Sequence, residues 1–322
     1  MNRAPLGVLT ILLTLLGWSS IPLFQKHFSH TIDAWTSNGW RYGFSALLWM
    51  PALIYAQRRG TLPTELWTAA LWPSLFNTLG QVAFTWAFYL IDPGLGTFGL
   101  RLQIVFVTLG AAALFESERR IVRRPGFVLG LMLVTFGTLG TLLLGTGFGQ
   151  RATLLGVLVA ISSGVIFAGY ALSVRRFMHG MQPLTAFAAI SLYTAIGSVV
   201  LMLLLGERHG ATVFALPKGL IGQLLLSSVI GIGLGHTLYY ASIARLGVAV
   251  SAGVIQLQPF LVAAASFFLF GERLSALQWG CGSLAVLGAA TILLVQQRAC
   301  RTAPPELSAD EAPLPKLRAA SS

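Results

Sequence analysis

The chain has 322 residues, of which 55% are hydrophobic and only 10% are charged. Because soluble domains carry about 25% charged residues, this composition excludes an ordinary soluble protein. The formal net charge of +11 does not predict nucleic-acid binding, since the basic residues lie in breaks and tails between long apolar blocks, as they do in the cytoplasmic loops of membrane proteins.

The apolar blocks are long enough to cross a membrane, because about 20 apolar residues in a helix span a bilayer core of about 30 Å. We predict an all-α integral membrane protein with ten transmembrane helices. The first block is interpreted as a helix rather than a signal peptide, since it lacks a clear cleavage site and more spans follow. The predicted spans are residues 5–25, 33–56, 65–91, 94–115, 125–145, 153–175, 183–206, 217–244, 247–270 and 275–297.

The lysines and arginines predict the orientation. With a cytoplasmic N-terminus, fourteen of the 21 would lie on the cytoplasmic side and five on the other side. This excess, and the even number of spans, predict that both termini are cytoplasmic. We expect a multi-pass protein of the cytoplasmic (inner) membrane, with residues 298–322 as a disordered cytoplasmic tail.

Short sequence matches recur in the same order in the two halves of the chain, at an offset that drifts only from 149 to 155 residues. Residues 1–145 and 153–297 are therefore predicted to be two five-helix repeats, joined by a linker at 146–152. Because five is odd, the second copy is inverted, an arrangement characteristic of secondary transporters with a substrate site near mid-membrane. The matches are Gly7-Val8-Leu9 with Gly156-Val157-Leu158, Arg59-Gly60 with His209-Gly210, Leu79-Gly80-Gln81 with Leu234-Gly235-His236, and Leu102-Gln103 with Leu257-Gln258.

The last two spans contain Leu257-Gln258-Pro259, Gly271-Glu272-Arg273-Leu274-Ser275, Trp279-Gly280 and Leu287-Gly288, and span 33–56 contains Arg41-Tyr42. Over residues 5–297 the chain resembles the EamA-type repeat of the drug/metabolite transporter superfamily. The first copy departs from the pattern, with Ile104 in place of the proline and Ser117 in place of the glycine. The resemblance implies a ten-helix carrier of small metabolites, often an exporter of amino acids or related compounds.

Two arginines lie inside predicted spans, where a charge is costly and marks a candidate functional site. Arg41 lies about 12 Å and Arg101 about 10 Å from the outer ends of their spans, at 1.5 Å per residue. We expect both to contribute a cationic patch for a carboxylate or another anion. The alternative is structural, with each arginine bound to helix-end carbonyls or reaching outward, and the resemblance suggests a scaffold role for Arg41. Polar residues on the same helix faces are Asn38, Ser45, Thr97 and Thr108.

An aromatic group follows His236, since Tyr239 and Tyr240 lie one turn further along the same face. Gln81 is the counterpart of His236 in the first repeat. We predict that His236, Tyr239 and Gln81 line a cavity suited to an amphipathic substrate, although aromatic residues at this spacing also serve helix packing.

Gln258 and Pro259 lie near mid-membrane, where proline removes a backbone hydrogen bond and kinks a helix. We expect Gln258 to contact the substrate and Pro259 to act as a gating or kink element, although a static kink is equally compatible. Pro259→Ala should then alter the transport rate more than the affinity, and Arg101→Ala should do the reverse.

No Asp or Glu lies deep in a predicted span, so His236 is the only good candidate for a protonatable group at depth. We hypothesise that transport is facilitated or exchange-like, or that its coupling depends on His236. Glu116, Glu118 and Glu272, at span ends beside arginines, are predicted to form interfacial ion pairs. The glycines of Gly231-x-Gly233-x-Gly235 are interpreted as close-packing positions.

Together these observations predict a secondary carrier rather than an enzyme, with no catalytic residues, cofactor or metal site. Its expected partners are a small-molecule substrate and the lipid bilayer, without nucleic acid, and it is expected to be a monomer or weak dimer. The expected substrates are amino acids or related amphipathic carboxylates, moved outward. The alternatives are a carrier of phosphorylated or nucleotide-sugar metabolites and, from another class, an integral membrane enzyme, which would need a His/Asp/Glu cluster at membrane depth.

Overall fold

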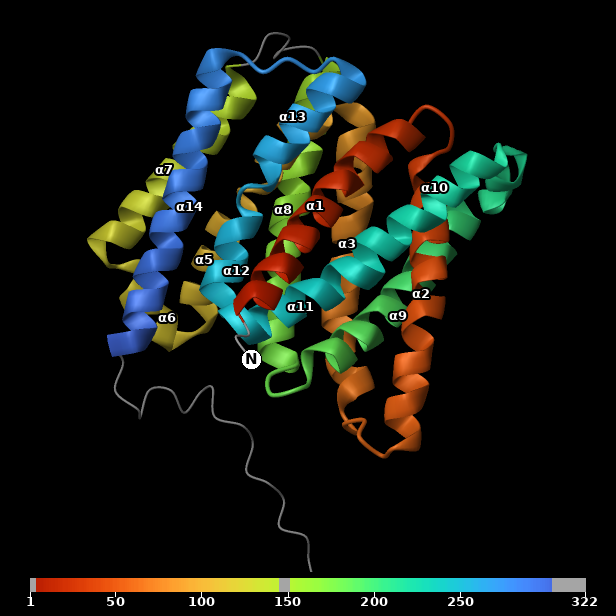
Figure 1. The fold of residues 1–322 in the computed structure, drawn as a ribbon, viewed down its shortest axis with the longest axis horizontal. Helices are drawn as coiled ribbons and strands as arrows, with labels where there is room; N and C mark the ends of the chain where they lie inside the picture. The colour runs from red at the N-terminus through yellow and green to blue at the C-terminus, as the bar shows by residue number, and fades with distance from the viewer. Residues whose placement is uncertain (1–3, 145–150, 303–322) are drawn as a thin grey trace, which may run out of the picture.

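The computed structural model describes residues 4–144 and 151–302, and these residues form helices and turns without a β-strand (Figure 1). The elements in chain order are α1 (Ala4–Phe28), α2 (Ala34–Arg58), α3 (Leu66–Leu90), α4 (Pro93–Leu100), α5 (Gln103–Leu114), α6 (Glu116–Val122), α7 (Pro125–Leu143), α8 (Arg151–Phe177), α9 (Pro183–Leu205), η1 (Glu207–Ala215), α10 (Lys218–Ser228), η2 (Val229–Leu234), α11 (Gly235–Leu246), α12 (Val248–Ile255), α13 (Gln258–Phe270) and α14 (Ala276–Thr302).

The predicted all-α membrane fold is confirmed. Within the described residues, eight helical segments are long and apolar enough to cross a bilayer. The helices α2 and α3 are not among these eight, although each has 25 residues. Both carry buried polar side chains, such as Asn38 and Arg41 on α2 and Asn77 on α3, which lower their apolar content. The count of ten spans therefore stays a prediction.

Most of the predicted linker and tail falls outside the described residues. Where the structure describes these segments, α8 begins at Arg151 and α14 continues to Thr302, past the predicted end of the last span at residue 297.

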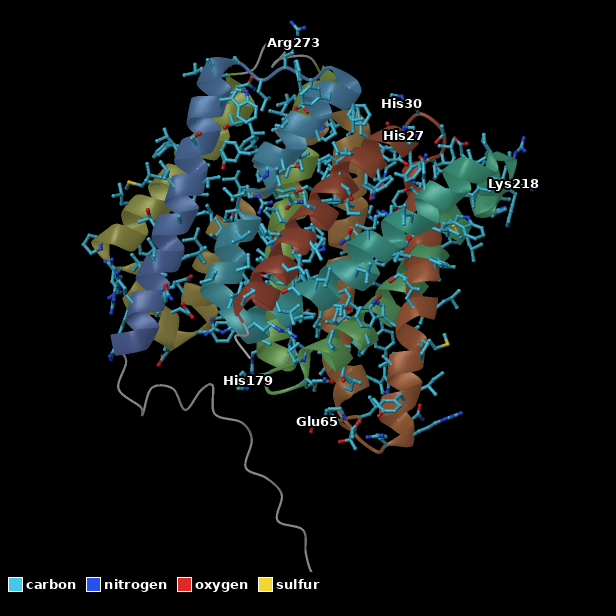
Figure 2. All side chains as sticks on the ribbon, viewed as in Figure 1. His27, His30, Glu65, His179, Lys218 and Arg273 are labelled. Atoms are coloured by element: carbon cyan, nitrogen blue, oxygen red, sulfur yellow. The ribbon has the colours of Figure 1, made fainter. Side chains whose placement is uncertain are left out.

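The helices pack in pairs that match the two-repeat architecture. Counted by span, α2 and α9 are equivalent and pack against each other, and so do α7 and α14. The packing of α3 against α8 has its counterpart in that of α11 against α1. In Figure 1, α1 begins at the lower end of the bundle, and α8 ends there near His179, which Figure 2 labels. The second set of helices therefore runs in the inverted direction.

Glycines allow the closest of these contacts. A Cβ atom on Gly80 of α3 would lie 2.9 Å from the ring of Phe167 on α8, and one on Gly235 of α11 would overlap the indole of Trp18 on α1. At the crossing of α7 and α14, a Cβ on Gly130 would lie 2.8 Å from the carbonyl oxygen of Gly288. The expected packing role is confirmed for Gly231 and Gly235, where a Cβ would collide with Ile21 and Trp18, since small residues let helices approach closely in membranes.

One span in each repeat is broken at the same place. The break between α4 and α5 lies at Arg101 and Leu102, and the break between α12 and α13 lies at Gln256 and Leu257. At both breaks, backbone hydrogen bonds join residues three apart, as in Ile104 N–H to Arg101 O at 3.2 Å and Phe260 N–H to Leu257 O at 3.1 Å.

Pro259 lies in the first turn of α13, where the missing N–H is tolerated. The first repeat breaks without a proline, because Ile104 occupies the equivalent position. Three glycines in α4 weaken the first span instead, since glycine is a poor helix former. The proline therefore marks the break in the second repeat, whereas the first repeat is broken at the equivalent place without one.

Candidate functional site

The site is centred on Arg101, which ends α4 at the break in the first repeat. Its guanidinium donates from Nη2 to Oε1 of Gln258 at 2.5 Å and from Nη1 to Oε1 of Gln256 at 3.5 Å. Both amides belong to the break in the second repeat, so the side chains bring the two breaks together. Arg101 forms no ion pair among the described residues, and its cation is held by neutral acceptors.

Trp18 of α1 links the hydrogen-bonded group of Arg101 and Gln258 to the span formed by α10, η2 and α11. Gln258 donates from Nε2 to the carbonyl oxygen of Trp18 at 2.9 Å, and the Trp18 indole donates to the carbonyl oxygen of Gly231 at 3.1 Å. Trp18 was not predicted as a site residue. In the first repeat, its counterpart Phe167 occupies the matching position against Gly80.

Gly231 lies in η2, a π-helical turn within the span formed by α10 and α11. A π turn breaks the regular α-helical hydrogen-bond ladder, and such turns are frequent at functional sites. Here the carbonyl of Gly231 accepts from the Trp18 indole, so the turn supplies an acceptor at the middle of the span.

An aromatic cluster lies beside this turn. The ring of His236 stacks on Phe187 of α9, with centroids 3.9 Å apart and planes at 15°, and it meets Trp18 edge-on at 5.2 Å. Tyr239 lies 4.9 Å from Trp18. The Nδ1 atom of His236 is 3.2 Å from the carbonyl oxygen of Ile232. His236 and Tyr239 thus meet around Trp18.

Arg41 is buried on α2 at 2% exposure and faces η2 from another side. Its Nε donates to Oγ of Ser227 on α10 at 2.9 Å, while its Nη1 has no hydrogen-bond partner. A Cβ on Gly231 would lie 3.7 Å from Nη2 of Arg41. Arg41 therefore borders the same π turn as Trp18 and has spare donor capacity, and it forms no ion pair within the described part of the chain.

Asn38 belongs to a separate hydrogen-bonded network between α1, α2 and α3. It donates to the carbonyl oxygen of Gln81 at 3.2 Å and accepts from Thr85 at 2.8 Å. Thr85 in turn accepts from Gln25 at 2.8 Å. These contacts join side chains that are all buried, so the network stabilises the helix packing. Gln81 takes part through its backbone carbonyl.

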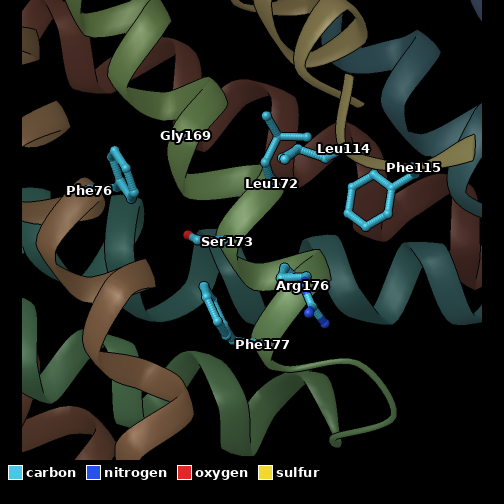
Figure 3. Close-up of a pocket in the computed structure, with 8 residues that line it drawn as sticks. All are labelled: Phe76, Leu114, Phe115, Gly169, Leu172, Ser173, Arg176 and Phe177. Atoms are coloured by element: carbon cyan, nitrogen blue, oxygen red, sulfur yellow. The ribbon is translucent and has the colours of Figure 1, made fainter. Parts of the chain in front are cut away.

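A cavity of about 650 Å³ lies elsewhere, between α3, α5 and α8 (Figure 3). Its size falls in the range of ligand pockets, but none of the predicted site residues lines it. The lining residues are Phe76, Leu114, Phe115, Gly169, Leu172, Ser173, Arg176 and Phe177.

The structure thus brings four of the predicted residues into one connected cluster through Trp18. These are Arg101, Gln258, His236 and Tyr239, with Arg41 on the far side of the π turn. Asn38 and Gln81 lie in the separate network, and Pro259 supports the break.

Comparison with known proteins agrees with this arrangement. The family model described as the EamA-like transporter family matches residues 5–143 and 154–294, one match for each set of helices. The chain belongs to the EamA-like transporter family. This membership makes it a multi-pass membrane transporter, and the family consists of transporters rather than enzymes.

A relative in Pseudomonas aeruginosa, described only as an uncharacterized protein, is 31% identical over 252 residues, which cover 78% of this chain and 81% of the relative. A solved crystal structure matches with a TM-score of 0.60 and 19% identity, covering 91% of this chain and 98% of the other. At that identity the match concerns the fold alone.

Proposed function

We propose that this EamA-family transporter is a secondary carrier that moves small amphipathic carboxylates outward by alternating access, with amino acids as the first class to test. The observation that carries the proposal is the cation of Arg101, which lies at the paired helix breaks and, among the described residues, is hydrogen-bonded to the amides of Gln256 and Gln258. A charge inside a membrane protein needs a compensating partner. A substrate carboxylate would provide one and would gain charge-assisted hydrogen bonds.

The aromatic cluster supports an apolar portion in the substrate. Trp18, His236 and Tyr239 combine apolar faces with polar atoms, which suits an organic compound that is charged at one end. A phosphorylated or nucleotide-sugar substrate would call for more cations than Arg41 and Arg101 provide. The paired breaks support alternating access, since discontinuous helices line mid-membrane sites in carriers built from inverted repeats.

Counterflow in proteoliposomes tests the substrate class. Vesicles loaded with an unlabelled amino acid should accumulate the labelled one, and the Arg101→Ala variant should lose affinity for it. Accumulation of sugar phosphates but of no amino acid would overturn the proposal. Efflux from preloaded cells that overproduce the protein tests the outward direction.

We also propose that the protein lies in the inner membrane with both termini in the cytoplasm. The support is the excess of arginine and lysine at one end of the bundle. Reporter fusions to each terminus test this orientation. Activity at either terminus of a reporter enzyme that works only outside the cytoplasm would contradict it.

A further inference from the structure

The carboxylate of Glu272 holds the two repeats together at the upper end of the bundle in Figure 1, near Arg273, which Figure 2 labels. It accepts hydrogen bonds from the backbone N–H groups of Gly94 and Leu95, each at 2.8 Å. These groups begin α4, and a carboxylate is favoured at a helix N-terminus. Gly271, in the left-handed conformation at φ 72°, ends α13 and turns the chain toward this site. The predicted ion pair of Glu272 with its neighbouring arginine is therefore absent from the described contacts.

A basic residue at the same end has its own partners. Lys26, in the last turn of α1, lies 3.2 Å from the carboxylate of Asp92 and donates to the carbonyl oxygen of Ile91 at 3.4 Å. The helices α4 and α13 pack against each other here. Glu272 is 8% exposed and lines a cavity of about 600 Å³ beside Phe267 and Trp279, so the contact between the repeats here consists of its hydrogen bonds to α4 and the packing of α4 on α13.

The lower end has the equivalent residues in a different arrangement. Glu118 corresponds to Glu272, and Arg175 corresponds to Lys26 at an offset of 149 residues, the offset of the first helices. Glu118 pairs with Arg175 at 2.7 Å, and the guanidinium of Arg175 also covers the ring of Phe115 at 4.3 Å.

The helix start that corresponds to α4 is that of α12, whose N-cap residue is Gly247, and Glu118 forms its ion pair with Arg175 rather than with this helix start. Among the described residues, α12 and α5 are not packed closely, although the equivalent pair α4 and α13 is. The positions that correspond to Gly94 and Leu95 are Ala249 and Val250. The lower end therefore holds the same components without close packing between α5 and α12.

We propose that Glu272 and Glu118 are paired latches that exchange positions during transport. At a closed end the glutamate caps the start of the broken span from the other repeat. At an open end it leaves that helix and pairs with the basic residue at the end of α1 or α8. One molecule displays both positions, with the upper end latched and the lower end released.

The opposite state follows from the repeat. Glu118 leaves Arg175 and accepts hydrogen bonds from the N–H groups of Ala249 and Val250, while Glu272 releases α4 and pairs with Lys26. The glutamates act as positioning residues for the change of state. This inference rests on membership of the transporter family and requires no particular substrate.

Opening of the upper end can be measured with the Ser266→Cys variant on α13, in a chain that also carries Cys281→Ala and Cys300→Ala. Ser266 is fully buried and its side chain lies beside the Glu272 carboxylate, so every labelling rate is compared with that of the Ser266→Cys parent. In nanodiscs, where both faces are accessible, the rate of labelling with a water-soluble maleimide reports opening of the upper end. The measurement needs no substrate, so it can fail independently of the proposed function.

Glu272→Ala removes two charge-assisted hydrogen bonds from the upper-closed state and should raise the labelling rate roughly tenfold or more. Glu272→Gln, which keeps one acceptor oxygen, should give an intermediate rate. Glu118→Ala removes the cap of the opposite state and should lower the rate by a similar factor. Arg175→Ala removes only the partner that holds Glu118 in the released position and should raise the rate by up to about fivefold.

The decisive result is the direction in which the labelling rate changes when each partner of the Glu118–Arg175 ion pair is replaced by alanine. In a static ion pair, Glu118→Ala and Arg175→Ala would change the labelling rate in the same direction, and that outcome would overturn the proposal. An unchanged rate in Glu272→Ala would overturn it as well. Melting temperatures of all variants show whether the fold is retained, and Glu272→Gln provides the test if Glu272→Ala does not fold.

Discussion

Replacing Arg101 by glutamine should weaken the binding of a carboxylate substrate while the helix breaks stay folded. The variant places at this position the residue type that the second repeat has at Gln256. The acceptors of Arg101 are the amide oxygens of Gln258 and Gln256, so its removal leaves no buried carboxylate without a partner. Gln258 also keeps its bond to the carbonyl of Trp18 at 2.9 Å.

The expected loss follows from the hydrogen bonds that the guanidinium would make to the substrate. A hydrogen bond to a charged group contributes about 1.5–3 kcal/mol, and about 1.4 kcal/mol corresponds to a factor of ten. The substrate concentration at half-maximal counterflow should therefore rise roughly 10- to 150-fold. The melting temperature of the purified variant should change little, because a costly charge is removed from the interior.

Counterflow in proteoliposomes measures this effect with an amino acid and with its amide, which lacks the charged carboxylate. The wild type should prefer the acid, and Arg101→Gln should lose that preference. Arg119→Gln is the matched control, because Arg119 is half-exposed on α6 and donates to the carbonyls of Ala112 and Ala113. Equal losses for the acid and the amide in Arg101→Gln would refute the reasoning.

Two further predictions concern the breaks and the aromatic cluster. Pro259→Ala should change the transport rate only a few-fold, because the first repeat forms its break with Ile104; loss of transport in a stable variant would show that the proline is essential. His236→Gln should retain counterflow but lose any dependence on a pH gradient, and strong gradient dependence in this variant would exclude His236 from coupling.

The fold could be predicted from the chain because hydropathy fixes the spans and the repeat fixes their relation. The matches at Gly80 with Gly235 and at Gln103 with Gln258 indicated the inversion, and the packing of equivalent helices agrees with it. The broken span in the first repeat could not be predicted, since Ile104 is compatible with a continuous helix. Glycine content in α4, rather than proline, accompanies that break.

The site was predictable where a residue is costly in lipid, as for Arg101, or carries a strong local pattern, as for His236 and Tyr239. Trp18 was missed because its role depends on the contact of α1 with α11, and a tryptophan in an apolar helix has no distinctive periodicity. Glu272 was assigned to a neighbouring arginine because its true partners, Gly94 and Leu95, are 178 and 177 residues away in the chain. Long-range backbone contacts of this kind leave no local pattern.

The π turn in the eighth predicted span has a consequence for how the two repeats diverged. Between the match at Gly210 and the match at Leu234, the second copy is five residues longer than the first copy between Gly60 and Leu79. One extra residue in a regular helix would rotate everything beyond it by about 100°. A π turn absorbs one of the five residues within a single turn, and the other four add about 400°, close to one full turn, so the helix beyond them nearly keeps its facing. His236 consequently remains the positional counterpart of Gln81, and the second copy could lengthen without losing its inward-facing residues.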